Sequence, residues 1–179
     1  MLERLSARIE KSWYQNKWWN IWLLPLSAIF FLMSHARRIW LTDIAKVSKN
    51  NQIPVVIIGN INVGGTGKTP TAMAIVTRLL ARGRKPHLVS RGYGGRLTGP
   101  VLVDERTHTA ADVGDEPLLL AAFAPTWVAQ DRAAGVQAAE AAGADVVLLD
   151  DGFQNPSVAK DLSIVVVDAQ RGCGNKRTL

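Results

Sequence analysis

The sequence predicts an α/β protein in which a parallel β-sheet is covered by helices on both faces and preceded by a helical N-terminal segment. Two observations predict the sheet. Runs of β-branched residues alternate with helical stretches over residues 51–179, and a glycine-rich loop joins the first run to a helix. Because residues 1–50 differ in composition, we divide the chain into an N-terminal segment, residues 1–50, and an α/β domain, residues 51–179.

The composition fits one globular domain with an appendage. Of the 179 residues, 47% are hydrophobic and 20% are charged, close to the average of globular domains and far from that of disordered chains. Cys173 is the single cysteine, which excludes an intrachain disulfide and favours a reducing compartment. With only three histidines beside it, a zinc cluster is not expected.

The first fifty residues combine tryptophan with positive charge. They hold five of the six tryptophans and eight of the 21 lysines and arginines, against three acidic residues, so the rest of the chain is nearly neutral. Tryptophan favours the bilayer interface, and basic side chains favour anionic headgroups. A nucleic-acid binder would instead spread its basic residues over a face of the folded domain. We therefore expect an anionic membrane surface as partner and no nucleic acid.

The apolar run from Trp18 to Met33 is too short and too interrupted to favour a spanning helix. It has 16 residues and includes Asn20, Pro25 and Ser27, whereas a span needs about 20 consecutive apolar residues. We expect a helical hairpin or a helix bent at Pro25, lying in the membrane interface. Two alternatives are a segment packed on the following domain and a secretory signal, which the acidic residues near the start disfavour.

A strand, a glycine-rich loop and a helix start follow one another in the α/β domain. Val55–Ile58 is a β-branched run, residues 63–69 read Val-Gly-Gly-Thr-Gly-Lys-Thr, and a helical pattern covers residues 71–81. This is the order of a phosphate-binding loop, because glycines let backbone N–H groups wrap a polyanion and the helix N-terminus adds positive charge. The sequence therefore predicts a sheet of the P-loop NTPase type, with a structural glycine turn as the alternative.

The loop residues have distinct expected roles toward ATP and Mg²⁺. Lys68 would reach the β and γ phosphates, and the Thr69 hydroxyl would bind the metal ion. The backbone amides expected to cradle the phosphates belong to Gly64, Gly65, Thr66 and Gly67. Asn62 stands where the usual motif begins with glycine, so the prediction depends on the strand before the loop and the helix after it.

Acidic pairs follow at two later points. Asp150 and Asp151 end an apolar strand, and a carboxylate at the carboxyl end of a parallel strand points into the crevice where such sheets bind ligands. Either could hold Mg²⁺, unless Asp-Asp-Gly is only a turn. Asp115 and Glu116 precede another apolar helical run. They begin a helix, or one of them accepts the proton of a hydroxyl that attacks a phosphoryl group.

The remaining segments complete the alternation of strands and helices. Strands are expected at residues 87–89, 126–129 and 162–167, and an alanine-rich helix at residues 132–142. Arg91 follows the first of these strands in a glycine-rich loop. It contacts phosphate there or is a surface charge.

In these motifs the chain resembles the tetraacyldisaccharide 4'-kinases of lipid A biosynthesis. The matching features occur in order along nearly the whole chain: Leu23–Leu26 in the tryptophan-rich start, residues 59–70, 90–95, 114–117, 130–132 and 150–154, Asp168, and residues 174–175. That family also begins its phosphate loop without the first glycine, which accounts for Asn62.

The resemblance implies an ATP- and Mg²⁺-dependent lipid kinase. It would phosphorylate the 4'-hydroxyl of tetraacyldisaccharide 1-phosphate, giving lipid IVA, at the cytoplasmic face of the bacterial inner membrane as a peripheral or monotopic protein. Asp115 would be the proton acceptor with Glu116 beside it. Asp150 and Asp151 would be the carboxylates on the metal side. Arg91 and Gln154 are further candidates for substrate contact, and no protein partner is implied.

Two features depart from the family pattern. Asn155 stands where the family usually has histidine. Members of the family are also longer, and the histidine partner of their catalytic aspartate lies in a second lobe that would follow Leu179. We therefore expect this chain to be a fragment or truncated product that binds nucleotide weakly and is poorly active or inactive. The rival functions are a non-catalytic membrane-associated nucleotide-binding remnant and a P-loop GTPase or metallochaperone-type NTPase, whose guanine motif Thr178 breaks.

Overall fold

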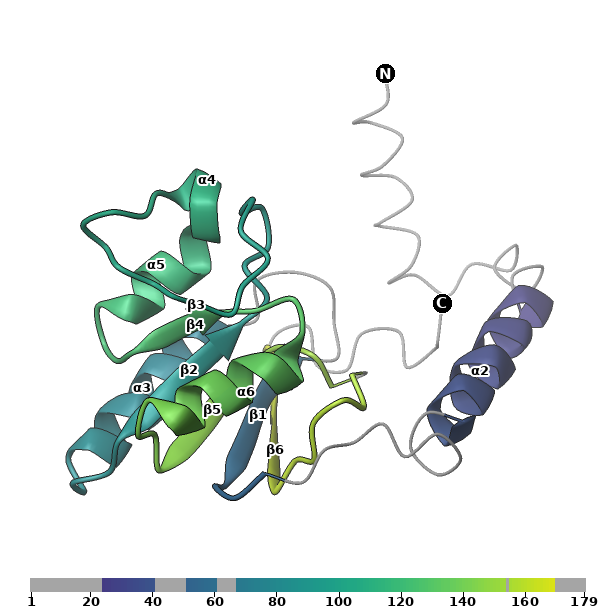
Figure 1. Ribbon diagram of the computed structural model, residues 1–179. Coiled ribbons are helices and arrows are strands. Elements are labelled where there is room, and N and C mark those ends of the chain that lie inside the picture. Colours follow the sequence, from purple (N-terminus) through teal and green to yellow (C-terminus); the bar gives the residue numbers. More distant parts are fainter. Residues whose placement is uncertain (1–23, 41–50, 61–66, 154, 170–179) are drawn as a thin grey trace.

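The computed structural model describes residues 24–40, 51–60, 67–153 and 155–169. Within these ranges a six-stranded sheet has the strand order β3-β4-β2-β5-β1-β6 (Figure 1). The strands are β1 (Val55–Asn60), β2 (Pro86–Ser90), β3 (Val101–Leu102), β4 (Thr126–Val128), β5 (Val146–Asp150) and β6 (Leu162–Val166). The helices are α2 (Leu24–Ile39), α3 (Lys68–Leu80), α4 (Ala110–Val113), α5 (Asp115–Ala121) and α6 (Arg132–Ala141).

Helices cover both faces of the sheet, as predicted. On one face Val136 of α6 packs in a buried apolar cluster with Val89 and Leu149. On the other face Val76 of α3 and Leu120 of α5 lie in a second buried cluster. Every residue of β2 and of β5 is buried, and burial on both faces explains why residues 146–149 of β5 form a continuous apolar run rather than an alternating one. The predicted α/β fold class is therefore confirmed.

One strand departs from the predicted parallel sheet. β3 pairs with β4 in antiparallel orientation at the edge of the sheet, whereas the other described pairings are parallel. β3 has only two residues, so it is too short to show a strand pattern in the sequence. The sheet is mixed, with a parallel body and one antiparallel edge.

Local signals explain where the two long helices of the domain begin and end. Gly67 precedes α3 in a left-handed conformation, with φ of 86°, so this helix starts three residues before the predicted 71–81 pattern. Gly83, with φ of 72°, follows the end of α3 and lets the Arg84 N–H reach the Leu79 carbonyl oxygen at 3.1 Å. Asp131 caps α6, since its carboxylate accepts hydrogen bonds from Ala133 and Ala134 N–H.

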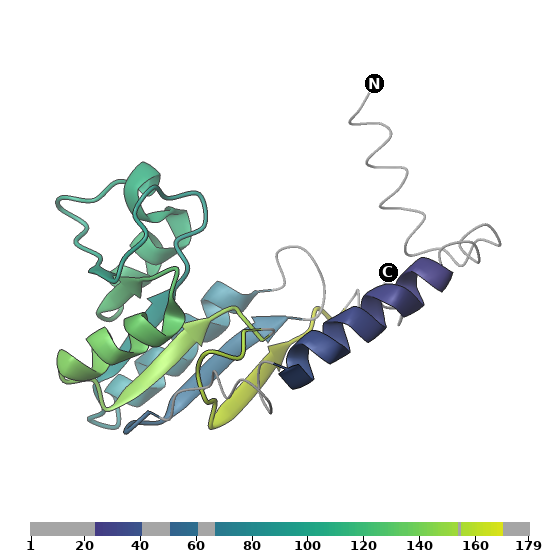
Figure 2. The same ribbon diagram turned by 45° about the vertical axis from the view of Figure 1, so that its right-hand side comes forward.

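The helix α2 stands apart from the sheet. Figures 1 and 2 both show α4, α5 and the loop before them at one end of the domain, with α2 on the opposite side. No residue of α2 belongs to the three apolar clusters formed by the described residues. Pro25 lies in the first turn of α2, where proline is tolerated. The expected bend would involve residues before 24, which lie outside the described residues.

Within the described part of the chain, no helix combines the length and the apolar character needed to cross a bilayer.

Candidate active site

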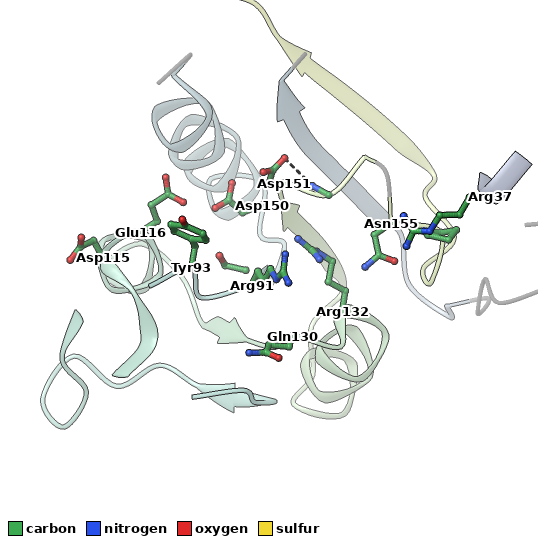
Figure 3. Close-up of a pocket in the computed structure, with 13 residues that line it drawn as sticks. Arg37, Arg91, Tyr93, Asp115, Glu116, Gln130, Arg132, Asp150, Asp151 and Asn155 are labelled. Carbon is green, nitrogen blue, oxygen red and sulfur yellow. Dashed lines mark hydrogen bonds between the residues drawn. The ribbon is translucent and has the colours of Figure 1, made fainter. Parts of the chain in front are cut away.

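A polar pocket of about 700 Å³ opens at the carboxyl ends of the parallel strands β2, β4 and β5 (Figure 3). It is lined by Arg37, Ser90, Arg91, Tyr93, Asp115, Glu116, Gln130, Arg132, Asp150, Asp151, Gly152, Asn155 and Pro156. This edge of the sheet is where open α/β folds bind ligands. The structure therefore brings together the two acidic pairs, Arg91 and the loop after β5, which the sequence named as separate candidates.

Lys68 connects the start of α3 to this pocket. Its Nζ lies 3.2 Å from Asp151 Oδ2, and it follows directly on the left-handed Gly67. Thr69 lies in the first turn of α3 and is half-buried. The other predicted cradle residues, Gly64, Gly65 and Thr66, lie outside the described residues. The described residues therefore include only the last part of the predicted phosphate loop, from Gly67, and the N-terminus of α3 that follows it.

Asp150 and Asp151 are neighbours in the sequence but differ in environment. Asp150 ends β5 and is only 4% exposed, and its Oδ1 is buried without a hydrogen-bond partner among the described residues. Burial raises the pKa of Asp150 to about 6, and the negative charge of Glu116 adds to the rise. Asp151 is exposed, has φ of 63° and pairs with Lys68. A buried carboxylate whose Oδ1 has no hydrogen-bond partner among the described residues, beside a second, accessible carboxylate, fits a cation site.

Asp115 and Glu116 enter the pocket from the first turn of α5. The helix follows Gly114, whose φ of 90° turns the chain between α4 and α5. In Figure 3 the Glu116 carboxylate lies on the side of Asp150, whereas Asp115 is at the outer edge of the pocket. Both residues line the cavity. The pair therefore begins a helix and also belongs to the pocket, so the two alternatives from the sequence are compatible.

Sequence reasoning assigned no role to Arg132, which the structure places in the pocket. This first residue of α6 is 9% exposed, and its Nε is buried without a hydrogen-bond partner among the described residues. Burial lowers its pKa, and the positive charge of Arg91 lowers it further. A Cβ at Gly152 would lie 2.9 Å from this Nε, so the glycine leaves room for the guanidinium. The available signal was its position shortly after β4, since the carboxyl end of a neighbouring parallel strand, β5, is what identified Asp150.

The other lining residues are polar and come from separate elements. Gln130 follows β4, and Tyr93 and Arg91 belong to the loop after β2. Asn155, where the related family usually has histidine, accepts a hydrogen bond from the Ser157 N–H at 2.8 Å. Gln154, a predicted substrate contact, lies outside the described residues.

The two carboxylates of Asp150 and Asp151 fit a magnesium ion that is also bound by nucleotide phosphates, rather than a metal ion whose ligands all come from the protein. Among the described residues, no group of three or more His, Cys, Asp or Glu side chains could hold an ion. Mg²⁺ in nucleotide sites usually takes one or two carboxylates and completes its shell with phosphate oxygens and water. Asp150 and Asp151 would supply those carboxylates, facing the start of α3 where phosphate would lie.

Comparison with known proteins places the chain in one family. The family model described as tetraacyldisaccharide-1-P 4'-kinase matches residues 19–179. The tetraacyldisaccharide 4'-kinase of Dinoroseobacter shibae is 72% identical over 127 residues, which are 71% of this chain and 38% of that protein. The one from a Jannaschia species is 59% identical over 157 residues, covering 88% of this chain and 46% of the relative.

A solved structure agrees with the sequence relatives. The crystal structure of LpxK from Aquifex aeolicus, described as the "apo" form in complex with ATP, has a TM-score of 0.68 and 30% sequence identity to this chain. The match covers 80% of this chain and 47% of the other. The chain thus spans less than half the length of these relatives. The resemblance inferred from the motifs is confirmed, and the chain belongs to the tetraacyldisaccharide 4'-kinase family.

Proposed function

We propose that this chain forms the nucleotide-binding part of a lipid kinase that phosphorylates the 4'-hydroxyl of tetraacyldisaccharide 1-phosphate, giving lipid IVA. The observation that carries the proposal is the meeting of Lys68, Asp151, Asp150 and Glu116 at one edge of the sheet. A cation from the phosphate loop and carboxylates from two other elements are what phosphoryl transfer requires. Family membership supports the choice of substrate class.

On the nucleotide side, Lys68 and the start of α3 would hold the triphosphate. Bound ATP would supply the γ-phosphoryl group, and Mg²⁺ would neutralise the charge that develops on it. The backbone of residues 64–67 would donate N–H groups to the phosphates, and the Thr69 hydroxyl would orient toward the metal ion. Asp150 and Asp151 would hold the ion from the opposite side, with Lys68 exchanging its contact with Asp151 for one with phosphate.

On the acceptor side, a carboxylate must take the proton of the attacking hydroxyl. As the hydroxyl oxygen bonds to the γ phosphorus, the bond to the β–γ bridging oxygen breaks and the hydroxyl proton passes to the base. We assign this role to Asp115, with Glu116 beside it. Arg91 and Arg132 would place positive charge next to the transferred group, which the unpartnered Arg132 Nε supports.

The N-terminal part would hold the domain at the membrane. We propose that residues 1–50 form an interfacial segment and residues 51–179 the N-terminal kinase domain, at the cytoplasmic face of the inner membrane. Exposed apolar side chains along α2 support this, because an enzyme in the interface meets acyl-anchored substrate at high local concentration.

A binding and turnover experiment with Lys68→Ala tests the proposal. ATP affinity should fall at least about tenfold, because the charged contact to the β and γ phosphates is lost. Arg78→Ala, in the last turn of the same helix, should leave affinity unchanged. Turnover is measured with tetraacyldisaccharide 1-phosphate in mixed micelles, and we expect it to be low for the 179-residue chain. Unchanged ATP affinity in Lys68→Ala would refute the site; ATP binding with no turnover at all would favour a non-catalytic nucleotide-binding protein.

A further inference from the structure

We propose that Asp112 is a positioning residue for the pocket, because its carboxylate ties together two segments that carry three of the pocket's seven charged side chains. The arginine loop, residues 91–97, follows β2; the acidic segment, residues 109–116, includes α4 and the start of α5. The lining residues that they contribute are Arg91, Tyr93, Asp115 and Glu116. Asp112 itself does not line the pocket, so it would act through these neighbours. The kinetic part of this inference rests on the proposed function; its structural part does not.

Both oxygens of the Asp112 carboxylate are fully engaged. Oδ1 accepts a hydrogen bond from Arg96 Nε at 2.6 Å and forms an ion pair with Arg96 Nη2, also at 2.6 Å, which joins it to the arginine loop. Oδ2 accepts from the Thr109 N–H at 2.8 Å and from the Thr109 hydroxyl at 2.7 Å, which closes a capping box within the acidic segment. These hydrogen bonds lower the pKa of Asp112 to about 2. Asp112 is buried although Arg96 is exposed.

The backbones of the two segments meet beside this clamp. Arg96 N–H donates to the Ala111 carbonyl at 3.0 Å, and Leu97 N–H donates to the Asp112 carbonyl at 2.9 Å. The chains approach so closely that a Cβ at Gly95 would lie 2.6 Å from the Val113 carbonyl carbon. A Cβ at Gly114 would lie 2.6 Å from the Tyr93 carbonyl oxygen. Glycine at these two positions allows the contact, and the Asp112 carboxylate adds the charged link that fixes it.

The clamp lies next to the turn that aims the acidic pair. Gly114, with φ of 90°, follows Asp112 by two residues and precedes Asp115 directly. A shift of the acidic segment against the arginine loop would therefore change how Glu116 and Asp115 face Arg91 across the cavity. Misplacement of about 1 Å can reduce a reaction about a hundredfold. The nucleotide side, formed by Lys68 at the start of α3, does not depend on this contact.

Substituting Asp112→Asn tests the structural part. The amide NH₂ cannot accept a hydrogen bond, so either Arg96 or Thr109 loses its partner. Amide exchange at Arg96 and Leu97, followed by NMR, should accelerate roughly tenfold. Asp104→Asn is the matched control, because Asp104 also accepts hydrogen bonds within a turn, from the Arg106 N–H and the Thr107 hydroxyl, and also has a lowered pKa. It should leave exchange at Arg96 and Leu97 unchanged.

Arg96→Gln is the second variant, in case Asp112→Asn does not fold. It leaves the Thr109 capping box in place, and Arg96 is exposed on the surface. In the kinase assay both variants should lower kcat about tenfold to a hundredfold with an unchanged KM for ATP, and Arg96→Lys should restore part of the loss. Unaltered exchange in both variants would overturn the clamp, as would a loss of stability with kcat and KM unchanged. If the unsubstituted chain shows no turnover, amide exchange alone decides the clamp, whereas the proposed function is decided separately by the ATP affinity of Lys68→Ala.

Discussion

Asp150 carries a charge that the folded chain disfavours. It is buried at the end of β5, and its pKa of about 6 lies above the ordinary value of 3.8. A group whose pKa is higher in the folded state stabilises the fold below its unfolded pKa and loses that contribution as the pH rises through the folded value. Each pKa unit corresponds to about 1.4 kcal/mol, so ionised Asp150 destabilises the ligand-free chain by roughly 3 kcal/mol at neutral pH.

Asp150→Asn should therefore stabilise the ligand-free chain at high pH. The gain over the unsubstituted chain should be larger at pH 8 than at pH 5 by roughly 1 to 2 kcal/mol, because Asp150 is mostly protonated at the lower pH. Urea unfolding at both pH values measures the difference. Asp151→Asn is the control, since Asp151 is exposed and paired with Lys68. A gain in stability that is equal at the two pH values would show that Asp150 is already neutral or already compensated.

Asp115 and Glu116 should contribute unequally to catalysis. If Asp115 takes the hydroxyl proton, Asp115→Asn should lower kcat by roughly a factor of 100 to 10,000 and leave ATP affinity unchanged. Glu116→Gln should have the smaller effect on kcat. Glu116 adds to the raised pKa of Asp150, so removing its charge should change Mg²⁺ dependence instead. The reverse order of the two effects on kcat would move the base from Asp115 to Glu116.

The sequence predicted the pocket residues that lie at strand ends, but it did not predict that the Arg132 side chain is buried there. Asp150 and Lys68 each follow or end a recognisable pattern, a parallel strand and a glycine-rich loop, so their place at one edge follows from topology. Arg132 obeys the same rule but resembles a surface arginine in an alanine-rich helix. Its burial depends on Gly152, which is distant in sequence and leaves space for the guanidinium. That contact requires the tertiary structure.

At the level of elements, β1 and the loop after β5 fit together through a glycine. A Cβ on Gly59, near the end of β1, would overlap the ring of Phe153, which packs on the core from the turn after Asp151. Gly59→Ala should destabilise the chain by about 1 to 3 kcal/mol, the usual effect of overpacking. It should also displace the turn that presents Asp151. Urea unfolding and ATP affinity measure the two effects.

A double-mutant cycle identifies the cause. Phe153→Ala removes the ring, so Gly59→Ala should destabilise a Phe153→Ala background far less than the original chain. Additive effects of the two substitutions would mean that Gly59 is needed for another reason.

The elements themselves were predicted where packing and periodicity agree. β1, β2, β5 and α6 match the expected positions, because buried strands need apolar β-branched residues and α6 has a cap at Asp131. β3 and α4 were missed. They have two and four residues, too few to show a period, and backbone hydrogen bonds to neighbouring segments hold them in place. Short elements of this kind depend on the fold around them.

At the level of the whole molecule, α2 carries a large apolar surface that the α/β domain leaves exposed. Leu26, Ile29, Phe30, Phe31, Leu32 and Met33 are each more than half exposed. None of them enters the apolar clusters of the domain. Burying these side chains in a lipid interface would be more favourable than leaving them in water, and the basic Arg37 on the same helix suits anionic headgroups.

Deleting residues 1–40 should separate membrane binding from folding. The shortened chain should stop co-sedimenting with anionic vesicles while its urea midpoint stays unchanged, because no residue of α2 belongs to the apolar clusters of the domain. Phe30→Asp/Phe31→Asp in the full chain should weaken vesicle binding at least about tenfold, since each buried phenylalanine is worth about 1.5 to 3 kcal/mol. Arg82→Gln/Arg106→Gln, which changes the net charge by the same two units at exposed positions of the α/β domain, is the control for net charge. If the deletion lowers the urea midpoint and leaves co-sedimentation intact, residues 1–40 pack on the domain and the interfacial assignment is wrong.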